Sequence, residues 1–148
     1  MAILAGCGGS SQSDTTRTVA GNGYRFEVPQ SGWKVSRRLR VLEARDGDKL
    51  VSVTTFPLVK PYRPELFAKV VPELDRVARQ LAAQENATIT NARTLMIAGR
   101  KARAYDVVHP SGPEERIAFV LSGPREFQLY CRNAGDVCDG FIESFRLR

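Results

Sequence analysis

The single histidine of this 148-residue chain, His109, limits the chemistry that the sequence can perform. Most acid–base and metal-binding constellations need an imidazole, and a chain with only one lacks most of them. Motifs of zinc proteases, serine hydrolases and phosphate-binding loops do not occur. Glu114 and Glu115 would point to opposite faces of a strand, so they form no catalytic pair by themselves. His109 precedes Pro110 in a predicted turn, where we expect it to be solvated. The sequence therefore predicts no enzyme, no metal site and no cofactor.

Cys7 follows a short apolar run and precedes a tract rich in Gly, Ser and Thr. The run Leu-Ala-Gly-Cys resembles the lipobox of bacterial lipoproteins, in which a diacylglyceryl group on the cysteine anchors the chain. Stable anchoring requires two acyl chains. We expect residues 1–7 to be a truncated signal with its lipobox and residues 8–22 to be a flexible tether. Cys7 would then be lipidated at the outer face of the cell membrane, and the basic and apolar regions of the signal would precede Met1. The alternative is an N-terminus that matches the motif by chance.

Cys131 and Cys138 lie close together near the end of the chain. In an exported protein such a pair predicts a disulfide, which for so short a loop stabilises the fold by about 2–3 kcal/mol in the chain-entropy model. The alternative is a metal or redox pair. The spacing is too long for a Cys-x-x-Cys motif, and one histidine offers little help in binding metal. We therefore expect the disulfide.

The chain has a net charge of +6, which favours anionic partners such as a membrane surface or a cell-wall polymer. The densest basic positions form the candidate contact surface for a partner: Arg37, Arg38, Arg40, Arg100 and Arg103. The other interpretation of these charges is a solvated surface. Aromatic residues do not alternate with them as in proteins that stack nucleic-acid bases, so no nucleic acid is expected as a partner. No run of about 18 apolar residues predicts a membrane span.

The first part of the chain predicts short strands, at residues 24–28, 33–35, 39–43 and 50–56. Their residues alternate between apolar and polar or are β-branched, as in half-buried strands. Residues 46–48, Asp-Gly-Asp, predict a hairpin turn between the last two strands. Leu39 and Val41 should share one face of their strand and Leu42 the other. Trp33, the only tryptophan, is expected to fill the core beside a turn.

The longest helical pattern covers about residues 64–84 and follows a Pro-rich linker at 57–64. Apolar residues recur at steps of three and four, which is typical of a helix with one face packed on a sheet. Pro72 interrupts the pattern, so either the helix kinks there or a short first helix stops and a second begins. Asp75 and Arg79 are expected to form an i,i+4 ion pair on the outer side.

The second half of the chain predicts further strands, at residues 86–97, 101–108, 116–121 and 126–131. Ala102 and Ala104 should lie on one face of their strand and Tyr105 on the other. A turn is expected at residues 123–124, and a terminal helix at 136–145. Because strands and helices are segregated along the chain, the pattern favours an α+β fold with an antiparallel sheet in one domain, residues 23–148.

Five short stretches resemble PsbP-like bacterial lipoproteins: residues 24–29, 31–35, 53–58, 99–102 and 141–145. The first two carry an aromatic-rich strand that meets a proline and then a Gly-Trp pair. The resemblance covers about residues 23–148 and implies a PsbP-like α/β/α sandwich, a central antiparallel sheet flanked by the long helix and the short C-terminal helix. Named members of this family are an extrinsic photosystem subunit and a Ran-binding nuclear import factor. Both are binding or assembly proteins without a catalytic residue set.

The leading hypothesis is an exported, membrane-anchored lipoprotein whose domain binds an unknown protein or cell-envelope ligand without catalysis. The first alternative is a soluble intracellular assembly or transport factor of the same fold, which predicts free thiols and an unmodified N-terminus. The second is an extracellular carboxylate-dependent hydrolase, which predicts turnover of a substrate that is lost when a carboxylate is replaced.

Overall fold

The computed structural model describes residues 15–148, so Cys7 and residues 8–14 of the predicted tether lie outside the described residues. Two antiparallel sheets form the framework of an α+β fold. The larger sheet has the strand order β3 (Lys34–Arg37), β4 (Val41–Asp46), β5 (Lys49–Tyr62), β8 (Glu115–Arg132), β7 (Arg100–Val108) and β6 (Thr88–Ile97). The smaller sheet has the order β1 (Thr16–Ala20), β2 (Tyr24–Pro29) and β9 (Arg146–Leu147).

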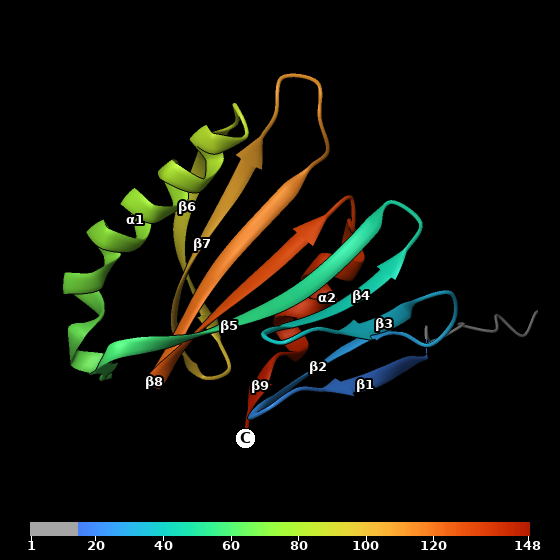
Figure 1. Cartoon of the computed structure of the whole chain (residues 1–148), viewed down its shortest axis with the longest axis horizontal. Coiled ribbons are helices and arrows are strands. Elements are labelled where there is room, and N and C mark those ends of the chain that lie inside the picture. The colour runs from blue at the N-terminus through green and yellow to red at the C-terminus, as the bar shows by residue number, and fades with distance from the viewer. Residues whose placement is uncertain (1–14) are drawn as a thin grey trace, which may run out of the picture.

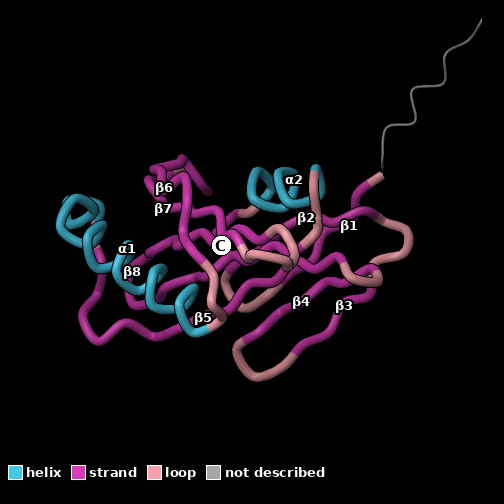
Figure 2. Tube along the Cα trace, turned by 90° about the horizontal axis from the view of Figure 1, so that it is seen from above, coloured by secondary structure: helices cyan, strands magenta, loops and turns pink. Residues whose placement is uncertain are grey.

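The larger sheet is the middle layer of the molecule (Figures 1 and 2). Helix α1 (Phe67–Gln84), which a 3₁₀ turn at Pro64–Leu66 precedes, packs over β6 and β7. Helix α2 (Asp136–Ser144) contacts β2 and β8. Successive residues of β8 point to opposite faces, so Val120 joins the core beside α2 and Phe119 joins the core beneath α1. The predicted sheet with a long and a short helix is therefore confirmed.

Strand β8 doubles back on itself at Gly123, which has a positive φ of 54°. The N–H of Asn133 donates to the carbonyl oxygen of Glu114 at 2.9 Å, so the residues that flank this strand lie side by side. The first arm pairs with β7 and the second arm with β5 (Figure 1). The predicted turn at residues 123–124 and the two strands around it are thus present.

An aromatic core and a disulfide hold α2 against the sheets. The rings of Phe26 and Phe141 meet edge to face with centroids 4.9 Å apart, a favourable aromatic geometry. The predicted disulfide joins Cys131 at the end of β8 to Cys138 in the first turn of α2, with their Cα atoms 5.7 Å apart. Trp33 is only 6% exposed, which confirms its predicted place in the core.

The structure corrects two predicted boundaries. The tether predicted over residues 8–22 is too long, because residues 16–20 form β1 and pair with β2. The linker predicted over 57–64 begins too early, because β5 continues to Tyr62. Its register with β8 shifts between Pro57 and Tyr62, and such a bulge accommodates proline within a strand. Prolines therefore mark an irregular strand here rather than its end.

Two further details of the elements differ from the sequence pattern. Leu42 is buried and Leu39 is 97% exposed, because Leu39 lies in the tight turn between β3 and β4. The backbone bonds that join Arg38 and Val41 close this turn and fix the register of β4.

Helix α1 continues through Pro72 as a single helix, so the predicted alternative of two helices divided there is wrong.

Candidate functional site

A cavity of about 460 Å³ opens where turns of both sheets meet. The turn between β1 and β2 forms one wall with Gly21 and Asn22, and the turn between β3 and β4 forms another. Thr55 of β5 lies in the lining as well. The cavity arginines, as we call them, also line it: Arg37, Arg38, Arg40 and Arg125.

Positive charge dominates this cavity, since none of the described residues that line it is acidic. Arg37 donates to the carbonyl oxygen of Ala20 at 2.7 Å, and Arg125 donates to that of Asn22 at 2.6 Å. The Arg125 guanidinium also lies over the ring of Phe127, 5.1 Å from its centroid. Each guanidinium has five N–H donors, so these bonds leave donors free. Within residues 15–148 no cavity arginine forms an ion pair.

Tyr24 adds a neutral polar group to the lining. Burial raises the pKa of its phenol, although the charges of Arg37 and Arg125 act in the opposite direction. The hydroxyl group of Thr55 also lines the cavity. The exposed Leu39 side chain stands between Arg38 and Arg40 at the rim. The cavity therefore offers several cationic donors, two hydroxyl groups and an apolar edge, which is a chemistry suited to an anionic group.

The predicted contact surface is only partly assembled. Arg37, Arg38 and Arg40 meet in the cavity, whereas Arg100 and Arg103 do not line it. The guanidinium of Arg100 contacts the carbonyl oxygen of Leu121 at 3.5 Å, and its Nε is buried without a hydrogen-bond partner among residues 15–148.

Arg103 is bound to a carboxylate instead. Its Nε and Nη2 donate to the two oxygens of Asp75 at 2.9 and 3.1 Å. This contact also corrects the prediction that Asp75 pairs with Arg79, because the nearest guanidinium comes from β7 and not from the same helix. Sequence reasoning missed Arg125, for which the only local signal was its place just after the turn at residues 123–124.

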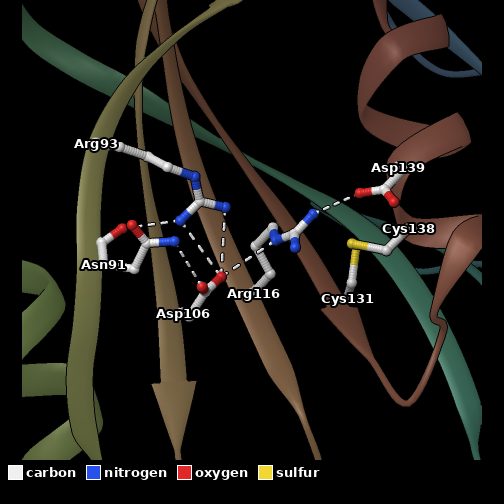
Figure 3. Close-up of polar contacts among 7 residues, drawn as sticks. All are labelled: Asn91, Arg93, Asp106, Arg116, Cys131, Cys138 and Asp139. Carbon is white, nitrogen blue, oxygen red and sulfur yellow. Dashed lines mark hydrogen bonds and ion pairs between the residues drawn. A yellow bond between two sulfur atoms is a disulfide. The ribbon is translucent and has the colours of Figure 1, made fainter.

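A second polar cluster lies between the sheet and α2, where arginines and carboxylates are matched (Figure 3). Asp106 of β7 accepts from Asn91 at 3.0 Å, and it lies 3.3 Å from both Arg93 and Arg116. Arg116 also donates to Asp139 of α2 at 2.7 Å. Burial acts to raise the pKa of Asp106, but the bond from Asn91 and the charges of Arg93 and Arg116 hold it below its ordinary value.

These contacts connect four elements, β6, β7, β8 and α2, beside the disulfide (Figure 3). We name the three residues that join carboxylates of other elements the bridging arginines: Arg93, Arg103 and Arg116. Their charges are matched within the protein, so they are not candidates for ligand binding.

No protein-family model matches the sequence, and no curated protein matches it. Among solved structures, the chain resembles the solution structure of cyanobacterial PsbP (CyanoP) from Synechocystis sp. PCC 6803. The sequences are 16% identical, the TM-score is 0.64, and the match covers 98% of this chain and 99% of the other. The chain has a PsbP-like fold. At this identity the similarity shows the fold alone, and the site must be argued from the residues of this chain.

His109 occupies a different place in the PsbP-like domain from the one predicted. Its side chain is only 13% exposed and lies between Glu85 and Glu115, so the prediction of a solvated loop residue is wrong. Gly112 explains this burial, because a Cβ at that position would lie 2.6 Å from the Cβ of His109. The loop after β7 can therefore pack against the histidine.

Helix α1 of the PsbP-like domain is amphipathic and carries charged side chains along its length. No helix in the described part of the chain is long and apolar enough to cross a membrane.

Proposed function

We propose that this chain is a membrane-anchored, extracytoplasmic binding protein that catalyses no reaction. It recognises an anionic group of its partner in the cavity that the cavity arginines line. The observation that carries the proposal is the gathering of the cavity arginines without an acidic residue among the described residues of the lining. Like charges that face a common cavity repel one another until a counter-charge enters. Guanidinium groups match the planar oxygens of a carboxylate or phosphate group, so either is a suitable ligand.

The anchoring part of the proposal rests on Cys7 and is supported by two features of the described chain. The disulfide between Cys131 and Cys138 is typical of proteins outside the reducing cytoplasm. Strand β1 begins at Thr16 and ends at Ala20, whose carbonyl oxygen binds Arg37 at the cavity. A strand of this length spans about 17 Å. The cavity therefore lies at the C-terminal end of β1, whereas the chain toward Cys7 leaves from the N-terminal end. In this position the cavity can meet a partner.

The cavity is tested by titrating inorganic phosphate into the ¹⁵N-labelled protein. We expect saturable shifts of the backbone amide signals of residues 21–24 and 37–42. The double variant Arg38→Glu with Arg40→Glu should bind phosphate at least tenfold more weakly. The control variant Lys60→Glu with Lys101→Glu makes the same change of net charge at exposed positions outside the cavity and should bind as the parent does. Equal weakening in both variants would show that net charge, and not the cavity, attracts the anion.

The anchor is tested by the intact mass of the protein extracted from its native membranes, with and without reductant. We expect the mass of the chain from Cys7 plus lipid, less two hydrogens for the disulfide. An unlipidated chain with free thiols would contradict the extracytoplasmic proposal and favour the intracellular assembly factor. This result would leave the phosphate titration unaffected, so the two parts of the proposal can fail separately.

A further inference from the structure

A further group of polar side chains, separate from the cavity and from the cluster around Asp106, meets at the opposite end of α1 from its 3₁₀ turn. Glu85 follows α1 directly, His109 follows β7 directly, and Glu115 is the first residue of β8. The Nε2 atom of His109 lies 2.6 Å from Oε1 of Glu115 and 3.8 Å from Oε2 of Glu85. One ligand-type atom from each residue lies within 4.8 Å of the other two. The ends of α1 and β7 and the beginning of β8 thus place a nitrogen and two carboxylates around one point.

The histidine nitrogen at the centre of this group has no satisfactory partner. Nε2 is buried, and despite its proximity to Glu115 it forms no hydrogen bond with any of the described residues. The contact is therefore close in distance but poorly directed for an N–H donor. Glu115 is itself only 7% exposed, and a buried carboxylate requires a compensating positive charge. Within residues 15–148 no lysine or arginine forms an ion pair with Glu85 or Glu115.

The charges around Glu85, His109 and Glu115 also favour a bound cation. Glu85 is the C-cap of α1, so it lies at the negative end of the helix dipole. The last turn of α1 contains no basic residue that would offset this potential. Burial and the nearby Glu115 carboxylate raise the pKa of the Tyr130 phenol, whereas the charge of Arg132 acts in the opposite direction. A locally acidic site thus exists in a chain whose net charge is +6.

We propose that Glu85, His109 and Glu115 bind a divalent transition-metal ion, with Zn²⁺ as the first candidate. One imidazole nitrogen and two carboxylate oxygens suit zinc, which binds both ligand types at about 2.0–2.2 Å. Tetrahedral geometry at these bond lengths separates ligand atoms by about 3.4 Å, so modest side-chain adjustment completes the site.

The exposure of the three ligands is consistent with entry of an ion from solvent. The Glu85 side chain is 63% exposed, whereas those of His109 and Glu115 form the buried floor. Three protein ligands leave a fourth position of zinc for water or for a group of a partner. A bound ion would also fix the end of α1 to the beginning of β8. Binding should therefore raise the thermal stability of the domain.

The first experiment is a zinc titration of the full chain without a histidine tag and with Cys7→Ser, because an unlipidated thiol would itself bind zinc. His109 is the only histidine, so its ring signals in a ¹H–¹⁵N spectrum report on the site without ambiguity. We expect saturable binding of one zinc ion, a large shift of the Nε2 signal, and an increase in Tm. Unchanged ring signals at saturating zinc would overturn the proposal.

Variants then separate the site from general acidity. Glu85→Gln changes an exposed side chain, so the protein should fold, and we expect its zinc affinity to fall at least tenfold. The control is Glu114→Gln, an adjacent carboxylate outside the group, which should retain the parent affinity. Isothermal titration calorimetry provides both dissociation constants. Equal affinities for the two variants would contradict the assignment, and so would zinc binding that persists in His109→Ala.

Discussion

The cavity arginines and the bridging arginines carry the same side chain in opposite circumstances. Each bridging arginine contacts a carboxylate from another element, as Arg103 of β7 does with Asp75 of α1. Among residues 15–148, the cavity arginines contact no carboxylate. Arg37 and Arg125 donate instead to backbone carbonyl oxygens. The first group should therefore contribute to stability and the second to binding. What separates the two is where the acidic residues lie, not how many arginines the chain has.

The largest expected effect on stability comes from Asp75→Ala. The carboxylate of Asp75 binds the guanidinium of Arg103 through two bonds and also accepts from the hydroxyl group of buried Tyr105. Its removal leaves both donors without their partner in a poorly solvated place. We expect the free energy of unfolding to fall by about 3 kcal/mol in urea denaturation. Glu73→Ala breaks an exposed ion pair with Arg76 on the same helix and should cost less than about 1 kcal/mol. A similar loss in both variants would show that the Asp75 contact is not special.

A smaller effect is expected for Arg116→Met, which keeps the length of the side chain and removes its charge. Arg116 joins Asp106 of β7 to Asp139 of α2. Because Arg116 is partly exposed, solvent reduces the contribution of these ion pairs to stability. Asp106 retains Arg93 as a partner. We expect a loss of about 1–2 kcal/mol, measured by urea unfolding. Arg45→Met removes a pair within one strand and should change stability by less than about 0.5 kcal/mol.

Local patterns in the sequence predict which face of an element a side chain occupies. Ala102 and Ala104 face one core and Tyr105 the other, as alternation along a strand requires. The helix at 64–84 and the disulfide also follow from local spacing. These features depend on residues that are near one another in the chain, and period and spacing report such relations directly.

The partners of charged residues could not be predicted in the same way. Asp75 has Arg79 at helical spacing, yet packing of α1 on β7 brings Arg103 closer. Arg125 contacts Asn22 across most of the chain, a pairing that exists only once both sheets have formed. His109 is buried by the loop that contains Gly112, whereas its place before a proline indicated exposure. The fold was therefore more predictable than the site.

The dependence of the free energy of unfolding on pH should reveal the carboxylates that pair with the bridging arginines. The pKa values of Asp75 and Asp106 are lower in the folded protein than in ordinary aspartates. The unfolded chain thus binds more protons as the pH falls, and the stabilisation present above about pH 4 is lost as the pH falls through the folded values. Asp106→Asn removes one of these groups, so its free energy of unfolding should decline less steeply between about pH 5 and pH 2. Parallel pH profiles for the variant and the parent would contradict this role of Asp106.

The smallest expected effect on stability belongs to the cavity. Arg38 and Arg40 are exposed and form no ion pair in the described part of the chain, so Arg38→Ala with Arg40→Ala should change the free energy of unfolding by less than about 0.5 kcal/mol. A slight stabilisation is reasonable, because removing like charges relieves repulsion within the cavity. The same variant should bind phosphate more weakly, and raising the salt concentration should reduce the difference from the parent. A large loss of stability would place these residues with the bridging arginines. Unchanged stability with unchanged phosphate binding would leave the cavity without a role as an anion site.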